Sequence, residues 1–187
     1  KDILYKVSIV DVAGSTNLAI PSLCFHSREA KKDCLFIAVR GTKTDGHQFL
    51  SQVADEGAIA IICEEFPAEM NERITYVKVK NTSEALGIIS SNFYDNPSSK
   101  LKLVGITGTN GKTTTATLLY NLFRSFGYGV GLISTVRIKI NSEEIPATHT
   151  TPDALTLNKL LAQMVERGCR YCFMEVSSHA VIQGRIS

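Results

Sequence analysis

No stretch of this 187-residue sequence contains the roughly 20 consecutive apolar residues that a membrane-spanning helix needs, so a membrane protein is excluded. Clustered positive charge is also missing, because 20 basic residues are balanced by 18 acidic ones and no basic run is longer than a pair. We therefore expect neither a nucleic-acid-binding stripe nor a membrane-surface patch. A basic segment followed by an apolar one, as in a secretion signal, is likewise missing. The start without Met and the abrupt end at Ser187 predict an excerpt of a longer protein.

The five cysteines show no spacing typical of a disulfide framework. Their odd number and irregular positions predict reduced thiols and a cytoplasmic location. Cys169 and Cys172 form an isolated C-x-x-C, but a second such pair is missing and the four histidines are widely scattered. We therefore interpret these two cysteines as small apolar residues at a helix–strand junction, rather than as a redox or zinc site.

An apolar content of 44% and a charged content of 20% are typical of a globular protein with one or two domains. The turn-forming residues from Asp95 to Lys100 predict a linker. This linker gives two domains, residues 1–97 and 98–187. In the first, strand-length apolar runs alternate with helical patterns, which predicts a small α/β domain. The expected strands are Cys34–Val39, Ala58–Glu64 and Ile74–Val79, and the expected helices are Gln48–Glu56 and Asn81–Tyr94.

The second half alternates strand and helix more regularly, which predicts right-handed crossovers and a parallel sheet. Only three such strands are found, so we expect a sheet that lacks further strands and a domain that is truncated. The expected strands are Leu101–Thr107, Gly129–Val136 and Tyr171–Val176, with a hairpin extension over 137–146. The expected helices are Thr113–Phe126, with Leu118, Leu119, Leu122, Phe123 and Phe126 inward, and Pro152–Gly168, with Leu157, Leu160, Leu161, Met164 and Val165 inward.

A glycine-rich segment, Gly105-Ile-Thr-Gly-Thr-Asn-Gly-Lys-Thr-Thr114, lies between a predicted strand and a predicted helix. This context is typical of a phosphate-binding loop, in which backbone amides and a helix N-terminus hold negative charge. Lys112 would supply a mobile cation for the phosphates and Thr113 a hydroxyl for Mg²⁺. The loop is shorter than the strict G-x-x-x-x-G-K-[ST] pattern, and the guanine-reading N-K-x-D motif is missing.

Glu175 follows three apolar or aromatic residues near the end of the predicted strand Tyr171–Val176, where phosphoryl-transfer sites place an acid beside the metal. We interpret it as a ligand of the metal, with a core ion pair as the alternative. The run Val176-Ser-Ser-His179 lies at the end of the same strand, where sites of α/β proteins gather. Without a G-x-S-x-G motif around it, ligand contact is favoured over a hydrolytic nucleophile.

These motifs resemble the Mur ligase family. The match runs in order from about Cys24 to the end of the chain. It rests on the segments Ser27-Arg28, Leu35-Phe-Ile-Ala-Val-Arg-Gly41, Thr44-Asp-Gly-His47, Thr107-Gly-Thr-Asn-Gly-Lys-Thr-Thr114, Thr148-His-Thr-Thr-Pro-Asp153, Met174-Glu-Val-Ser-Ser-His179 and Gln183-Gly-Arg185.

The resemblance implies a small N-terminal α/β uridine-binding domain followed by a partial P-loop parallel-sheet domain that binds ATP. It implies an ATP-dependent ligase of peptidoglycan synthesis that joins a diamino acid to a UDP-N-acetylmuramoyl dipeptide through an acyl-phosphate. Within the family, meso-diaminopimelate is favoured over L-lysine as the added amino acid. A monomer that contacts neither nucleic acid nor a membrane is expected, and the excerpt alone is expected to be inactive.

The resemblance also assigns roles to individual residues. The catalytic residues would be Lys112 and Glu175, and Mg²⁺ would be held by Thr113 and Glu175. The triphosphate would lie against Gly108, Thr109, Asn110, Gly111, Lys112, Thr113 and Thr114. The uridine end of the substrate would contact Ser27, Thr42, Lys43 and Thr44. The diphosphate and muramoyl portion would contact Thr150, Thr151, Ser177, Gln183 and Arg185, with His149 adjacent.

Three other functions are consistent with the phosphate loop. Folylpolyglutamate synthetase shares the acyl-phosphate chemistry but has no N-terminal uridine domain, so residues 1–95 disfavour it. A regulatory module would bind ATP without turnover. A P-loop small-molecule kinase would have no affinity for uridine nucleotides.

Overall fold

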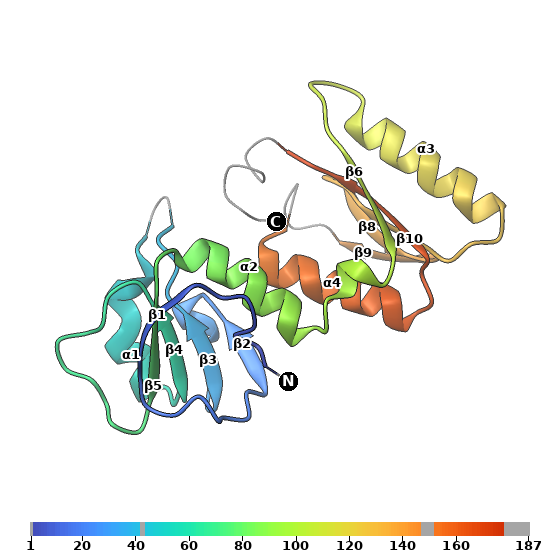
Figure 1. Ribbon diagram of the computed structural model, residues 1–187. Coiled ribbons are helices and arrows are strands. Elements are labelled where there is room, and N and C mark those ends of the chain that lie inside the picture. The colour runs from blue at the N-terminus through green and yellow to red at the C-terminus, as the bar shows by residue number, and fades with distance from the viewer. Residues whose placement is uncertain (1, 42–43, 147–151, 178–187) are drawn as a thin grey trace. The chain divides into compact units, whose positions relative to one another are not determined.

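The computed structural model describes residues 2–41, 44–146 and 152–177, and the chain divides into two compact units (Figure 1). The first unit contains residues 4–89. The second contains the residues from 90 onward and the N-terminal tip, where the Asn92 amide donates to the Ile3 carbonyl at 3.1 Å. This division falls within a helix, ahead of the Pro97/Ser98 boundary, which stays a prediction. Among the described residues, no helix is both long and apolar enough to cross a membrane.

The first unit is built on a five-stranded sheet with the order β1-β5-β4-β3-β2. Strands β2 to β5 are parallel to their neighbours, and β1 pairs antiparallel with β5. Every residue of β3 and β4 is buried, as expected for parallel strands covered on both faces. The elements are β1 (Ile9–Ala13), β2 (Ser22–Cys24), β3 (Cys34–Ile37), α1 (Leu50–Asp55), β4 (Ala60–Cys63), β5 (Thr75–Val79) and α2 (Thr82–Phe93).

The predicted strands of this unit correspond to β3, β4 and β5, whereas β1 and β2 were not predicted. Both lie at the edges of the sheet. β2 is only three residues long, and four of the five residues of β1 are exposed. The predicted start of α2 is confirmed, because the Asn81 side chain accepts hydrogen bonds from the amides of Ser83 and Glu84.

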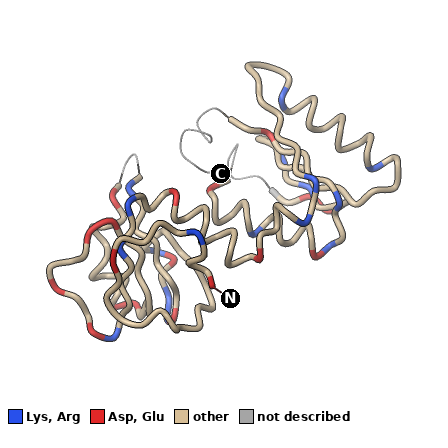
Figure 2. The backbone as a smooth tube through the Cα atoms, in the orientation of Figure 1, with Lys and Arg blue, Asp and Glu red and all other residues tan. Residues whose placement is uncertain are grey.

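The second unit contains a sheet with the order β6-β10-β7-β8-β9. Strand β10 lies between β6 and β7 and is parallel to both, which confirms the predicted parallel sheet. The predicted hairpin extends the same sheet as antiparallel strands β8 and β9. The elements are β6 (Lys102–Ile106), α3 (Lys112–Ser125), β7 (Val130–Ile133), β8 (Arg137–Ile140), β9 (Glu143–Pro146), α4 (Ala154–Glu166) and β10 (Tyr171–Glu175). Figure 2 shows acidic and basic residues interspersed in each unit.

The helix α4 packs as predicted. Leu157, Leu160, Leu161 and Met164 are buried, and Val165 packs against the same cluster. A glycine with positive φ follows both α3 and α4, Gly127 at +83° and Gly168 at +74°. Such residues end helices without the steric penalty that a side chain would bring.

The predicted inward face of α3 is wrong in part. Leu118, Leu122 and Phe126 are 63%, 47% and 63% exposed, whereas Ala116 and Tyr120 are buried and Leu119 and Phe123 pack against their cluster. Apolar residues occupy a wide arc of this helix. Their spacing therefore fits two neighbouring faces, and only the position of the sheet decides which face is covered.

Phe123 anchors α3 to the sheet through other aromatic rings. Its ring centroid lies 4.6 Å from that of Tyr171, 5.1 Å from that of Phe173 and 6.0 Å from that of Tyr128. Tyr171 and Phe173 belong to β10, the central strand of the parallel part of the sheet. This contact therefore fixes the helix that follows the glycine-rich loop.

Substitutions on the two faces of α3 should change the free energy of unfolding by very different amounts. Phe123→Ala should lower the free energy of unfolding by about 3 kcal/mol, because it removes a ring that packs against four others. Leu118→Ala, on the outer face, should change it by less than about 0.5 kcal/mol, because this leucine is 63% exposed. Urea unfolding of both variants measures the difference. Equal losses would show that the outer face is also packed.

Candidate functional site

Parallel strand pairing brings the glycine-rich loop and Glu175 to the same edge of the second sheet. In the register of β10 with β6, Met174 lies opposite Gly105 and Glu175 opposite Ile106. The pairing continues one residue further, where the Val176 amide donates to the Ile106 carbonyl at 2.9 Å. Because both strands run in the same direction, the loop after Ile106 and the residues after Glu175 emerge side by side. This is the edge at which α/β proteins place their ligands.

Two glycines shape the loop through their backbone conformation. Gly108 has a φ of +148° and Gly111 a φ of +80°, values that residues with a side chain rarely adopt. Apart from its chain neighbours, no atom of the described residues lies within 4 Å of the point where a Cβ of Gly111 would be. Its positive φ therefore explains the glycine at this position.

The first turn of α3 differs from the first turns of two other helices. Asn81 caps α2, and the Asp153 carboxylate caps α4 by accepting from the Thr156 amide at 2.9 Å. At α3 the cap residue is Gly111, and within the described chain no side chain accepts from its first turn. The first amides of a helix have no partner within the helix. Those of α3 are therefore oriented to bind an anion.

Lys112 folds back onto this loop. Its ammonium group donates to the Gly108 carbonyl at 2.6 Å and contacts the Thr109 carbonyl at 3.4 Å. Carbonyl oxygens are neutral acceptors, whereas phosphate oxygens carry negative charge and would also attract the ammonium group electrostatically. A phosphate held by the loop would therefore draw the ammonium group away from these carbonyls.

Glu175 is 1% exposed, and one residue, Thr135, connects its carboxylate to the first turn of α3. Its Oε1 atom accepts the Thr135 amide at 3.1 Å, and the Thr135 hydroxyl lies 3.4 Å from the Thr113 hydroxyl. The structure therefore brings together the two predicted metal ligands, Thr113 and Glu175.

Thr135 was not predicted as a site residue, because the sequence placed it inside a strand extending to Val136. β7 instead ends at Ile133, so that Thr135 lies beyond the strand. A signal was available, since β7 is parallel to β10 and its carboxyl end must lie at the same edge of the sheet. A hydroxyl residue near that end was a candidate for the site.

The donor set of this edge fits Mg²⁺ rather than a softer metal. Mg²⁺ prefers oxygen ligands and is usually bound through one or two carboxylates together with substrate phosphates. Glu175 provides one buried carboxylate, and Thr113 and Thr135 provide hydroxyl groups nearby. In the described part of the chain, no group of three or more His, Cys, Asp or Glu side chains could hold a metal alone.

The predicted substrate-binding residues are only partly described. Ser177 follows β10 at the carboxyl edge of the second sheet. In the first unit, Ser27 opens a short 3₁₀ helix after β2, and Thr44 lies in the connection after β3. Because β2 and β3 are parallel, both residues lie beyond the carboxyl edge of that sheet. The predicted residues Thr42, Lys43, His149, Thr150, Thr151, Gln183 and Arg185 lie outside the described residues.

Comparison with protein families matches both halves of the chain. The family described as "Mur ligase family, catalytic domain" matches residues 20–94. The family described as "Mur ligase middle domain" matches residues 106–187. The two matches lie on either side of the predicted linker.

Curated proteins named UDP-N-acetylmuramoyl-L-alanyl-D-glutamate–2,6-diaminopimelate ligase are similar over the whole chain. That of Cytophaga hutchinsonii is 58% identical over 188 residues, which cover 100% of this chain and 39% of the relative. That of Bacteroides fragilis is 53% identical over 187 residues, with the same coverage. That of Clostridium tetani is 40% identical over 188 residues, again with 100% and 39% coverage. The chain therefore spans about two fifths of the length of these relatives.

Solved structures support the fold. A UDP-N-acetylmuramoyl-L-alanyl-D-glutamate–2,6-diaminopimelate ligase aligns with a TM-score of 0.73 at 24% identity, covering 91% of this chain and 36% of that protein. MurF ligase from Thermotoga maritima, in complex with ADP, aligns with a TM-score of 0.53 at 21% identity, covering 86% and 33%. At these identities the likeness concerns the architecture alone.

Proposed function

This chain belongs to the Mur ligase family, and on that premise we propose that it forms the UDP-substrate and ATP-binding parts of a ligase for peptidoglycan synthesis. The ligase would add a diamino acid to UDP-N-acetylmuramoyl-L-alanyl-D-glutamate. The names of the relatives favour meso-diaminopimelate over L-lysine as that amino acid. The observation that carries the proposal is the edge at which the Gly108–Thr114 loop meets the buried Glu175.

The proposed reaction has two steps. The terminal phosphoryl group of ATP passes to the free carboxylate of the dipeptide, giving ADP and an acyl-phosphate. The amino group of the diamino acid then attacks the acyl carbon, an amide bond forms, and phosphate leaves. Both steps move charge at a phosphoryl group, so that positioning and electrostatic stabilisation are what the protein must supply.

The loop residues supply these effects in different ways. Amides of Thr109, Asn110 and the first turn of α3 would hold the phosphate oxygens. The Lys112 ammonium would follow the charge that develops on the transferred group. Mg²⁺, held by Thr113 and Glu175, would neutralise phosphate charge when bound. Thr135 would keep the Glu175 carboxylate in place through its amide, which already donates to Oε1.

The remaining proposals concern the residues that contact the rest of the substrate, the domain boundary, the cellular location and the oligomeric state. We infer that Ser27 and the segment Thr42–Thr44 contact the uridine end. Thr150, Thr151, Ser177, Gln183 and Arg185 would contact the diphosphate and muramoyl portion, with His149 adjacent. We also propose the domain boundary between Pro97 and Ser98, a cytoplasmic location and a monomeric state.

Lys112→Ala tests the electrostatic role of the loop. In a ligase of the relatives' full length that carries this sequence, it should lower kcat by about 10² to 10³, the usual loss for one such stabiliser. The matched control is Lys102→Ala, because Lys102 lies at the opposite end of β6 and its ammonium group faces the Tyr171 ring. Ligation rates at saturating dipeptide measure both. Near-normal turnover of Lys112→Ala would refute the role.

Calorimetry with UDP-N-acetylmuramoyl-L-alanyl-D-glutamate tests the substrate class on the 187-residue chain itself. We expect saturable binding that UDP weakens by competition, because the uridine end provides part of the contact. Ser27→Ala should weaken the binding, whereas Ser51→Ala, at an exposed position of α1, should not. Binding of ATP without affinity for either uridine compound would instead favour a kinase or an ATP-binding module.

A further inference from the structure

A tight turn over residues 134–137 connects β7 to β8, and a buried hydroxyl group holds it closed. Ser134 is 1% exposed. Its hydroxyl donates to the Arg137 carbonyl at 2.8 Å and accepts the Arg137 amide at 3.1 Å, and its own amide donates to the same carbonyl at 3.0 Å. These hydrogen bonds join the two ends of the turn, and Thr135 and Val136 lie between them.

Thr135 links this turn to two other elements of the second unit. Its amide donates to Oε1 of Glu175, the last residue of β10, at 3.1 Å. Its hydroxyl oxygen lies 3.4 Å from the hydroxyl oxygen of Thr113, in the first turn of α3. Glu175 and Thr113 are the two proposed ligands of Mg²⁺. One residue therefore contacts both of them, and it does so through two different groups.

The two inner residues of the turn differ in what they contact. Val136 is 62% exposed, and its amide turns back to the Ser134 hydroxyl at 3.4 Å. Thr135 is partly buried, and both its amide and its hydroxyl are directed at neighbouring elements. The turn needs neither of these two contacts to close, because the hydrogen bonds between Ser134 and Arg137 already close it. The contacts of Thr135 therefore act on its neighbours rather than on the turn.

A hydroxyl group that binds a cation must direct its proton elsewhere. Its oxygen faces the cation with a lone pair, so that the O–H bond points away and needs an acceptor. In the pair formed by Thr113 and Thr135, either hydroxyl can be the donor. With a cation on Thr113, Thr113 becomes the donor and the Thr135 oxygen the acceptor. A partner of this kind orients a metal ligand and makes it a stronger one.

We propose that Thr135 is a positioning residue of the metal site and that Ser134 holds it in place. The Thr135 amide fixes the Glu175 carboxylate, and its hydroxyl accepts the proton that Thr113 directs away from a bound cation. This role rests on the proposed function, because Mg²⁺ is assigned there to Thr113 and Glu175. It goes further by giving the Thr135 hydroxyl a task that matters only when a metal ion is bound.

Thr135→Val is the main test, because valine has nearly the same shape, keeps the amide and lacks the hydroxyl. Calorimetry on the 187-residue chain measures the dissociation constant of ATP twice, with EDTA and with excess Mg²⁺. With Mg²⁺, the constant should be about tenfold higher in Thr135→Val than in the wild type, the usual order of loss when a metal ligand loses its partner. With EDTA it should be unchanged, because without a metal ion the acceptor is not needed.

Three further variants support the main test. Thr135→Ser keeps the hydroxyl and should bind ATP with Mg²⁺ as tightly as the wild type. The matched control is Thr115→Val, which makes the same substitution at an exposed position of α3 and should change neither dissociation constant. If Thr135→Val does not fold, Thr135→Ala takes its place with the same expectation, because it also lacks the hydroxyl.

NMR supplies two readouts that need no ligand. The three-bond couplings that report the χ1 angle of Thr113 should indicate one staggered conformer in the wild type and in Thr135→Ser, and an average of conformers in Thr135→Val. Ser134→Ala tests the anchor, because it removes the hydroxyl that closes the turn. In this variant the Thr135 amide should exchange faster with solvent, while amides of the central strand β10 exchange at unchanged rates.

The outcomes separate this role from the proposed function. If Mg²⁺ strengthens ATP binding equally in the wild type and in Thr135→Val, and the Thr113 couplings are the same, the positioning role is overturned and the proposed ATP and metal site remains. A wild-type chain that does not bind ATP, with or without Mg²⁺, overturns both. A loss of equal size with EDTA and with Mg²⁺ also contradicts the proposal, because it traces the effect to the shape of the loop.

Discussion

The parallel pairing of β10 with β6 and β7 is the interaction on which the candidate site depends. It sets Glu175 level with Ile106, so that a buried carboxylate lies beside a loop separated from it by more than sixty positions in the sequence. It also places the end of β7 at the same edge, from which Thr135 reaches both Glu175 and Thr113. Slippage of the register would separate these groups, because nothing in the loop itself specifies where Glu175 lies.

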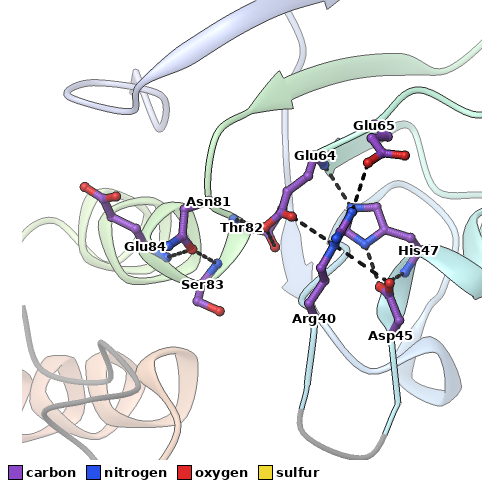
Figure 3. Close-up of polar contacts among 9 residues, drawn as sticks. All are labelled: Arg40, Asp45, His47, Glu64, Glu65, Asn81, Thr82, Ser83 and Glu84. Carbon is purple, nitrogen blue, oxygen red and sulfur yellow. Dashed lines mark hydrogen bonds and ion pairs between the residues drawn. The ribbon is translucent and has the colours of Figure 1, made fainter.

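In the first unit, parallel strand pairing likewise brings residues distant in the sequence to one edge of the sheet. The connections after its parallel strands emerge at one edge and carry Ser27, Thr44, Glu64 and Thr82. At this edge the two oxygens of the Glu64 carboxylate bind Arg40 and Thr82 (Figure 3). In the second unit the Glu175 carboxylate instead accepts the Thr135 amide, near a helix whose first turn no side chain of the described residues caps.

Much of this organisation could be predicted from the sequence because it rests on local patterns. Buried parallel strands are continuous apolar runs, so β3, β4 and β10 were found. The loop and Glu175 were predicted as site residues because glycines before a helix and an acid at the end of an apolar strand are typical of phosphate-binding sites. The inner face of α3 could not be predicted, because its apolar residues cover more of the helix than the sheet covers.

The edge strands, Thr135 and Glu64 were missed for different reasons. Strand β1 has mostly exposed residues and β2 has three residues, so neither leaves an apolar pattern. Thr135 was missed because its strand was predicted to extend to Val136, although the predicted parallel sheet already brought the strand ends to one edge. The partners of Glu64 lie far away in the chain, and a single sequence does not show which distant strand lies next to which.

Paramagnetic broadening by Mn²⁺ measures most directly whether the carboxyl edge of the second sheet holds a metal ion. Mn²⁺ added with ATP to the ¹⁵N-labelled chain broadens the amide signals of nearby residues. The account predicts the strongest loss of signal at Thr113, Thr135, Glu175 and the Gly108–Lys112 loop, with a weaker effect at Lys102 at the opposite end of β6, and much weaker broadening of all of them in Glu175→Gln. Broadening centred elsewhere, or equal broadening in Glu175→Gln, would contradict it.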